Sequence, residues 1–267
     1  MLVCALLYAC WSLLARRQYP KVVIYYHAVP TQWLKKFRRH MAYLARRCDV
    51  VKPSVIAREF EPVMSSKRST VAITFDDAFV SVYENARPIL RELNLSAGVF
   101  VPAGNLGDLP QWEMPDHRSD KNESVMGPEQ LRQMDKEGFE IGSHSFSHPK
   151  LATLCFKDLQ TELSESKRIL EDAIGHEIAA VSYPLGSYDE RVWKTAGMIG
   201  YKLGFTVEPE AVNESSGALL IGRFEVSANE SLFKFRLKIM GAYRGRKYLA
   251  SMKRFLIALI GRLKSSR

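Results

Sequence analysis

The sequence predicts a single α/β domain in which helices cover parallel strands. Its 267 residues contain no repeat and no long Gly/Pro/Ser linker, so the length fits one larger α/β domain. Apolar segments typical of strands alternate with amphipathic segments typical of helices through the middle of the chain. About seven such strands fit a closed barrel better than a short open sheet.

The expected strands are short apolar segments, several of which end in a polar residue. They comprise residues 22–27, 71–76, 97–102, 139–144, 179–184, 202–207 and 218–224. The expected helices comprise residues 33–47, 80–93, 128–137, 157–174 and 190–199. Because helices separate most of the successive strands, the strands are expected to run parallel with the helices outside.

Polar side chains gather at one end of these expected strands. The residues at or just after a carboxyl end are His27, Asp76, Asp77, His144, Pro184 and Arg223. A β/α barrel collects its catalytic groups at that end. We therefore expect these residues to share one site.

The two ends of the chain differ in composition from this domain. From Lys234 onward there are eleven Lys or Arg and no Asp or Glu. Because the net charge of the whole chain is +9, the residues before Lys234 carry a slight net negative charge. Residues 253–264 mix apolar side chains with cations, which is typical of an interfacial helix on anionic lipid. A helix packed on the domain is the alternative. The cations gather in one apolar tail rather than among aromatics around a groove, so no nucleic-acid partner is expected.

The N-terminal end is apolar up to Arg16 and Arg17. Its run of roughly thirteen apolar residues is shorter than the ~20 that span a bilayer, and it lacks the features of a cleaved signal peptide. Arginines after the run favour a cytoplasmic domain. We expect a membrane-associating segment (1–20), a catalytic domain (21–233) and a basic amphipathic tail (234–267), at the cytoplasmic face of the bacterial inner membrane.

The spacing of acids and histidines predicts a metal site. His144 and His148 lie four residues apart, a spacing used for paired metal ligands if the chain turns helically there. With Asp77 they form a two-His-one-carboxylate set that leaves positions open for water and a substrate oxygen, as a catalytic divalent metal requires. Asp76 is then free to act as a base. The four cysteines show no CxxC pairing, so neither a disulfide framework nor a thiolate zinc site is expected.

Three motifs resemble those of the polysaccharide deacetylase (NodB-homology) family. They are TFDDAF (74–79), HSFSHP (144–149) and SYPLGSYD (182–189), and the resemblance covers about residues 21 to 226. It implies a distorted (β/α)7 barrel and the metal-dependent hydrolysis of N-acylated sugars, with Zn²⁺ as the expected ion. It also implies that Asp76 is the base, that Asp77, His144 and His148 are the ligands, and that the backbone N–H of Leu185 stabilises the oxyanion.

Further substrate contacts are expected from two places. Tyr183 and Pro184 belong to the third motif and are expected to face the sugar. Trp112, in the polar loop before residue 128, is a candidate platform for a pyranose ring. The alternative for Trp112 is that it only anchors its loop. His40 and His176 lie in or beside helical patterns and are expected at the surface.

Three departures from the family pattern require replacements. Ala78 stands where the family has Gly, Ser182 stands where it has the Arg that orients the base, and no late Leu-x-x-His motif follows. The segment that ends in His27 resembles the early Tyr-His segment of the permuted exopolysaccharide deacetylases of the poly-N-acetylglucosamine type. His27 is therefore the candidate general acid, and Arg223 the candidate guanidinium for Asp76. The alternatives are a buried His bonded to backbone and an Arg whose head reaches solvent at the barrel rim.

The expected function is the metal-dependent hydrolytic removal of an N-acyl group, with N-acetyl as the expected group, from a sugar of a polysaccharide or a lipid-linked glycan precursor. The alternatives are a deformylase of a lipid-linked amino sugar and an inactive glycan-binding barrel. An inactive barrel would be expected to lose the base or a ligand, and all four residues are present.

Overall fold

The structure is a computed structural model that describes residues 19–58, 68–114, 120–212 and 217–242. The expected segment 1–20 and the expected tail 234–267 therefore lie mostly outside the described residues. No helix within the described ranges is both long and apolar enough to cross a membrane.

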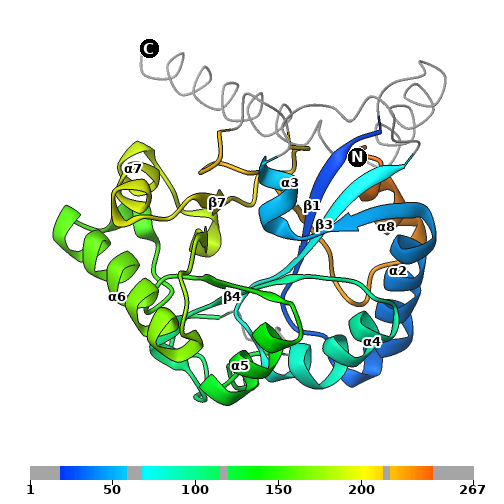
Figure 1. Cartoon of the computed structure of the whole chain (residues 1–267), viewed down its shortest axis with the longest axis horizontal. Helices are drawn as coiled ribbons and strands as arrows, with labels where there is room; N and C mark the ends of the chain where they lie inside the picture. Colours follow the sequence, from blue (N-terminus) through cyan, green and yellow to red (C-terminus); the bar gives the residue numbers. More distant parts are fainter. Residues whose placement is uncertain (1–18, 59–67, 115–119, 213–216, 243–267) are drawn as a thin grey trace, which may run out of the picture.

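A curved, all-parallel sheet forms the centre of the molecule, and helices surround it on the outside (Figure 1). The strand order is β7-β6-β5-β4-β3-β1-β8, and β2 pairs with β3 beside this path. The strands are β1 (Lys21–Tyr26), β2 (Cys48–Val51), β3 (Ser69–Phe75), β4 (Gly98–Val101), β5 (Glu140–Ser143), β6 (Ala180–Ser182), β7 (Leu203–Phe205) and β8 (Phe224–Glu225). The predicted α/β fold with a distorted barrel is thus confirmed.

The central strands β1 and β3 are continuous apolar segments because both faces of them are covered. They pair in register from Lys21 with Thr70 to Tyr26 with Phe75. The first half of β3 pairs with β2 and the second half with β4. The carboxyl ends of β1 and β3 therefore lie next to each other, which places Tyr26 and Asp76 side by side through an Asp76 N–H to Tyr26 O bond of 2.8 Å.

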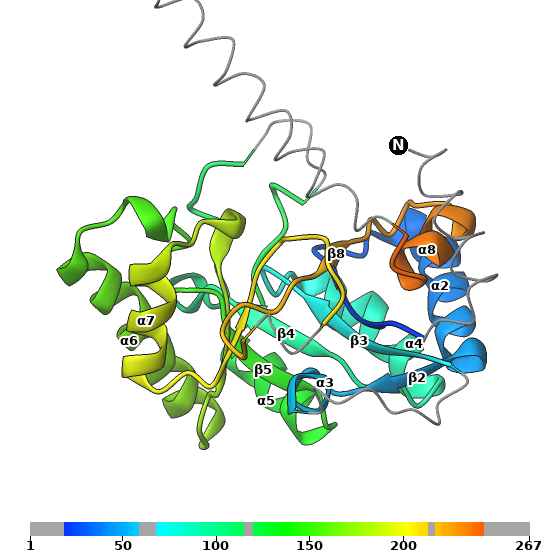
Figure 2. The same cartoon turned by 90° about the horizontal axis from the view of Figure 1, so that it is seen from above.

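The helices lie outside the sheet (Figure 2) and pack apolar side chains against it. In α2, for example, Phe37, Met41 and Leu44 are buried at helical spacing. The helices are α2 (Leu34–Arg47), α3 (Pro53–Arg58), α4 (Arg87–Glu92), α5 (Pro128–Lys136), α6 (Phe156–Ile174), α7 (Glu190–Ile199) and α8 (Leu232–Ile239). A π-helical segment, Val82–Ala86, precedes α4, so the predicted helix 80–93 is not one regular α-helix.

The predicted strand 218–224 is only partly a strand. Residues 217–223 run between β7 and β1, with an isolated bridge from Phe205 to Ile221, and regular pairing begins only at Phe224. Backbone hydrogen bonds nevertheless connect this segment to β7 and the residue after it. The Ile221 N–H donates to Gly204 O at 2.8 Å, and the Thr206 N–H donates to Ile221 O at 2.8 Å. The sheet thereby closes loosely rather than as a regular barrel.

One strand and two α-helices of the described residues were not predicted from the sequence, namely β2, α3 and α8. Helix α8 contains the predicted start of the tail at Lys234, and its Phe235 and Ile239 are buried in the core. Residues 234–242 are therefore part of the folded domain.

The expectation that His40 lies at the surface is wrong, because its side chain is buried. Its ring stacks on Phe235 at 4.3 Å, its Nδ1 lies 3.1 Å from the Tyr26 hydroxyl, and its Nε2 lies 3.1 Å from Glu230 O. His40 thus joins α2 to α8. His176 is exposed as expected and pairs with Asp135.

Candidate active site

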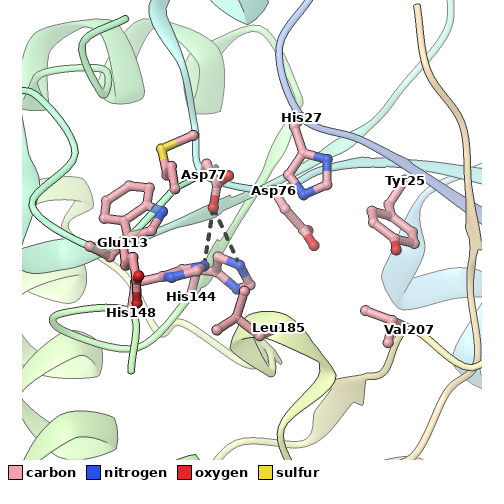
Figure 3. Close-up of a pocket in the computed structure, with 11 residues that line it drawn as sticks. Tyr25, His27, Asp76, Asp77, Glu113, His144, His148, Leu185 and Val207 are labelled. Atoms are coloured by element: carbon pink, nitrogen blue, oxygen red, sulfur yellow. Dashed lines mark ion pairs between the residues drawn. The ribbon is translucent and has the colours of Figure 1, made fainter. Parts of the chain in front are cut away.

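A pocket of about 200 Å³ opens at the carboxyl ends of the strands (Figure 3). Its lining brings together most of the predicted site residues from motifs that are far apart in the sequence. The lining residues are Tyr25, His27, Asp76, Asp77, Trp112, Glu113, Met114, His144, His148, Leu185 and Val207.

Asp77, His144 and His148 present three buried ligand atoms to one point. Oδ1 of Asp77 lies 3.6 Å from Nε2 of His144 and 3.4 Å from Nε2 of His148. Ligands that bind Zn²⁺ at ~2.0–2.2 Å in tetrahedral geometry lie about 3.3–3.6 Å apart, so these separations fit a bound ion. The donor set, two imidazoles and one carboxylate, also fits a divalent metal.

The two histidines are held by different contacts. His144 Nδ1 lies 2.8 Å from Ser182 O, which makes Nδ1 the protonated nitrogen and leaves the Nε2 lone pair facing Asp77. The His148 backbone N–H donates to Ser145 Oγ at 3.0 Å, and its ring packs on Trp112 at 4.6 Å. Glu162 of α6 accepts two N–H groups of the intervening turn. The turn is therefore anchored to the helix layer.

Backbone strain concentrates at this site. Five of the six described non-glycine residues with positive φ belong to the motifs, namely Asp77, Ala78, Ser145, His148 and Leu185. Such conformations cost of order 1–3 kcal/mol each and persist where the surrounding structure enforces them. Ala78, with φ of 50°, stands where the family has Gly, so the methyl group at this position is strained.

Asp76 is paired with Arg223, which is fully buried. Nη1 and Nη2 of Arg223 donate to the two carboxylate oxygens of Asp76 at 2.7 and 2.8 Å. The remaining N–H groups of Arg223 bond to Thr206 O, Thr74 Oγ1 and Ser182 Oγ. All five donors of the guanidinium are thus used. Arg223 does not reach solvent at the rim, and the small side chain of Ser182 is part of its binding site.

Charges around the pocket set the protonation of its acids. Burial alone would raise the pKa of Asp76, but the charge of Arg223 and its hydrogen bonds lower it below the usual range. Burial opposes ionisation of Asp77 as well, and the hydrogen bond to His148 with the nearby histidines lowers its pKa overall. Burial lowers the pKa of His144 to about 4. Both acids are ionised and His144 is neutral at pH 7, as metal ligation requires.

His27 lies at the end of β1 and faces the pocket beside Asp76 (Figure 3). It is only partly buried, and its ring packs edge-on against Tyr25 at 5.6 Å. A partly exposed imidazole in this position is able to exchange protons with a group in the pocket.

The third motif contributes its backbone more than its side chains. Leu185 has φ of 56°, lies in the first turn of a short 3₁₀ helix (Pro184–Gly186) and lines the pocket. N–H groups in a first helical turn have no partner within the helix, so that of Leu185 is available to a ligand. Tyr183 and Pro184, in contrast, are buried outside the pocket lining, and the Tyr183 hydroxyl donates to Leu219 O at 3.0 Å. Their predicted contact with a sugar is not supported by this placement.

Trp112 lines the pocket, and its ring packs on His148 and Phe79. It therefore anchors its loop, and a role in sugar stacking stays a prediction. Four further residues line the pocket without having been predicted from the sequence, namely Tyr25, Glu113, Met114 and Val207. Of these, only Tyr25 could have been predicted from the sequence, because it lies two residues before His27 near the end of an expected strand. In the structure its ring covers the Arg223 guanidinium at 4.4 Å.

Comparison with known proteins gives a consistent relationship. A family model described as polysaccharide deacetylase matches residues 64–204. Over 198 residues the chain is 28% identical to YxkH of Bacillus subtilis, a protein provisionally named a polysaccharide deacetylase. It is also 28% identical over 179 residues to the poly-β-1,6-N-acetyl-D-glucosamine N-deacetylase of Staphylococcus aureus. The matches cover 74% and 63% of this chain but only 66% and 58% of those two relatives.

Solved structures share the fold. The deacetylase PplD of Streptococcus pyogenes superposes with a TM-score of 0.69 at 22% identity, covering 84% of this chain and 99% of PplD. IcaB of Ammonifex degensii superposes with a TM-score of 0.68 at 22% identity, covering 85% of this chain and 98% of IcaB. At this level of identity the likeness concerns the fold.

Proposed function

Because the chain belongs to the polysaccharide deacetylase family, we propose that it hydrolyses the N-acyl group, with acetyl as the expected acyl group, of an amino sugar in a glycan. The observation that carries the proposal is the separation of 3.4 and 3.6 Å between the buried donor atoms of Asp77, His148 and His144. In this proposal these residues hold a divalent ion, with Zn²⁺ expected.

The ion, when bound, would polarise the acyl carbonyl and lower the pKa of a water molecule. Asp76 would accept the proton of the attacking water, since it is ionised and faces the pocket. Arg223 would keep Asp76 ionised and oriented without leaving its own buried position.

Two further groups complete the proposed chemistry. The Leu185 N–H would donate a hydrogen bond to the acyl oxygen as negative charge develops on it. His27 would protonate the leaving amine, because it lines the same pocket and imidazole is the side chain that most often acts as a general acid. The base and the acid would then be separate side chains, one on each of two adjacent strands.

For the substrate we propose a polymer of N-acetylglucosamine. The Staphylococcus aureus relatives are named for such a polymer, although the match covers 58% of their length. A lipid-linked N-acylated sugar is the alternative substrate. The acid released in the assay, acetate or formate, identifies the acyl group.

The test is acyl release by the full-length protein, before and after loading with Zn²⁺. Acetate would be measured with β-1,6- and β-1,4-linked N-acetylglucosamine oligomers and with a lipid-linked N-acetyl sugar, and formate with the N-formyl counterparts. Asp76→Asn is the matched inactive control. Metal-stimulated acetate release that is absent in the control is expected. Formate release alone would indicate a deformylase, and no release from any amide would contradict the proposal.

A further inference from the structure

The outer face of α2 carries a line of cations. Lys35, Arg39 and Arg46 are all exposed, and spacings of four and seven residues place them on one stripe of the helix, opposite the buried Phe37, Met41 and Leu44. No side chain of α2 neutralises these positive charges, because this helix contains six Lys or Arg and neither Asp nor Glu.

The N-terminal part of this arrangement opposes the stability of the helix, whereas Arg46 lies in the last turn, where a cation is favourable. Lys35 lies in the first turn, where the helix dipole favours acidic side chains, and α2 has none there. Lys35 and Arg39 are also like charges at i and i+4, which repel each other. A sequence selected only for folding would not need this pattern, so the charges point to a partner outside the domain.

Helix α8 extends the same positive region. It packs beside α2 (Figures 1 and 2), and the Arg236 guanidinium lies 5.5 Å from the Tyr43 ring of α2. Lys234 and Arg236 are exposed, and the neighbouring Phe233 is an exposed apolar side chain. We call Lys35, Arg39, Arg46, Lys234 and Arg236 the α2–α8 basic surface.

Two acids beside α2 and α8 are already paired with cations outside this surface. Glu92 binds Arg38 through both oxygens, at 2.6 and 2.7 Å. Glu230 pairs with Lys238 at 2.8 Å. These two acids therefore do not neutralise the α2–α8 basic surface.

Both ends of the described chain lie near this surface. Figure 1 shows the start of β1 and helix α8 close to each other beside α2. The apolar residues 1–18 join the chain before β1, and residues 243–267, with eight Lys or Arg and no acid, join it after α8. The composition of both segments suits a lipid surface, and the described chain meets both of them close to the α2–α8 basic surface (Figure 1).

We propose that the α2–α8 basic surface docks on an anionic lipid bilayer. The pocket opens at the carboxyl ends of the strands, whereas this surface lies on the outer helix layer, so docking leaves the pocket open to a glycan. The inference is independent of the proposed reaction, since it concerns a different face of the molecule.

The experiment measures binding of the full-length protein to vesicles of phosphatidylcholine with and without phosphatidylglycerol. The test variant is Lys35→Gln, Arg39→Gln, Arg46→Gln. The matched control removes the same charge from exposed positions on α5 and α6, as Arg132→Gln, Lys136→Gln, Lys157→Gln. The test variant should melt close to the wild type, because all three side chains are exposed and such surface substitutions usually change the free energy of unfolding by less than about 0.5 kcal/mol each.

The wild type should bind anionic vesicles more tightly than neutral ones, and less tightly at high salt. Each cation near an anionic leaflet changes partitioning about fivefold, so the test variant should bind on the order of 100-fold more weakly while the control stays within a few-fold of the wild type. Equal binding by test and control variants would overturn the proposal. So would unchanged vesicle binding together with weakened binding to duplex DNA, which would identify a nucleic-acid surface instead.

Discussion

Arg223 and Asp76 are 147 residues apart in the sequence and form a fully buried, two-point ion pair. Their contact joins the segment after β3 to the segment before β8, and β1 lies between these two strands in the sheet. Ser182 Oγ accepts a hydrogen bond from the same guanidinium at 2.7 Å. The residue that departs from the family pattern therefore makes room for an arginine supplied by another strand.

Replacing Arg223 should lower both stability and turnover. Arg223→Met leaves the Asp76 charge buried without a partner, which typically costs 3–5 kcal/mol. Arg223→Lys keeps the charge but loses the two-point geometry and should lower kcat with a smaller loss of stability. Urea unfolding and acetate release measure the two effects. Arg168→Met, at an exposed ion pair, should cost less than about 1 kcal/mol and serves as the control. An Arg223→Met protein as stable as this control would contradict the structural role.

His27→Ala should lower kcat by roughly 10²–10⁴-fold if the imidazole protonates the leaving amine. Bound metal should be unchanged, because His27 is not among the three candidate ligands. A substrate with a more acidic leaving amine should lose less activity. His176→Ala, at an exposed histidine, is the control and should keep wild-type turnover. Wild-type turnover in His27→Ala would place the acid elsewhere.

Ala78→Gly should be tolerated better than a glycine at an ordinary backbone position. Ala78 has φ of 50°, where a Cβ costs about 1–2 kcal/mol. Ala86 is equally buried but has φ of −79°, so Ala86→Gly relieves no strain and loses the methyl group. Ala78→Gly should therefore be the more stable variant by about 1–2 kcal/mol in urea unfolding. The reverse order would show that residue 78 is unstrained.

Several of these features follow from the sequence because they are local. Strands β1 and β3 are continuous apolar segments, and the DD pair and the HxxxH spacing place ligands at strand ends. Strand β2 was missed because it has four residues and includes the exposed Asp49. Helix α8 was missed because its cations were assigned to a tail, although Phe235 and Ile239 have the spacing of a buried helix face.

Other features depend on tertiary contacts that no local pattern contains. The positive φ of Ala78 arises in the turn after β3, whose ends are fixed by bonds to distant segments, such as Met126 N–H to Ala78 O. His40 was expected at the surface, but α8 covers it. The burial of Tyr183 follows from its bond to Leu219, in the segment that closes the sheet.

Acid should destabilise the protein partly through His40. Burial lowers the pKa of His40 to about 4, below its ordinary value near 6.5. The unfolded chain therefore binds a proton that the folded chain does not, so this contribution is fully present above pH 6.5 and is lost as the pH falls toward 4. Between pH 7 and pH 5 the loss should be about 2 kcal/mol. His144 makes the same contribution to the pH dependence of unfolding in the wild type and in His40→Gln. The difference between the two proteins in the free energy of unfolding as a function of pH therefore reports the contribution of His40. Identical pH dependence would contradict the buried, neutral state of His40.

The central claim, that Asp77, His144 and His148 hold an ion while Asp76 acts as the base, is tested most directly by measuring bound metal and turnover in the same two variants. Asp76→Asn should retain the metal of the wild type and lose turnover by roughly 10²–10⁴-fold, because the base is not a ligand. His148→Ala should lose both, because too few donors remain. Undiminished metal in His148→Ala, or wild-type turnover in Asp76→Asn, would contradict the account.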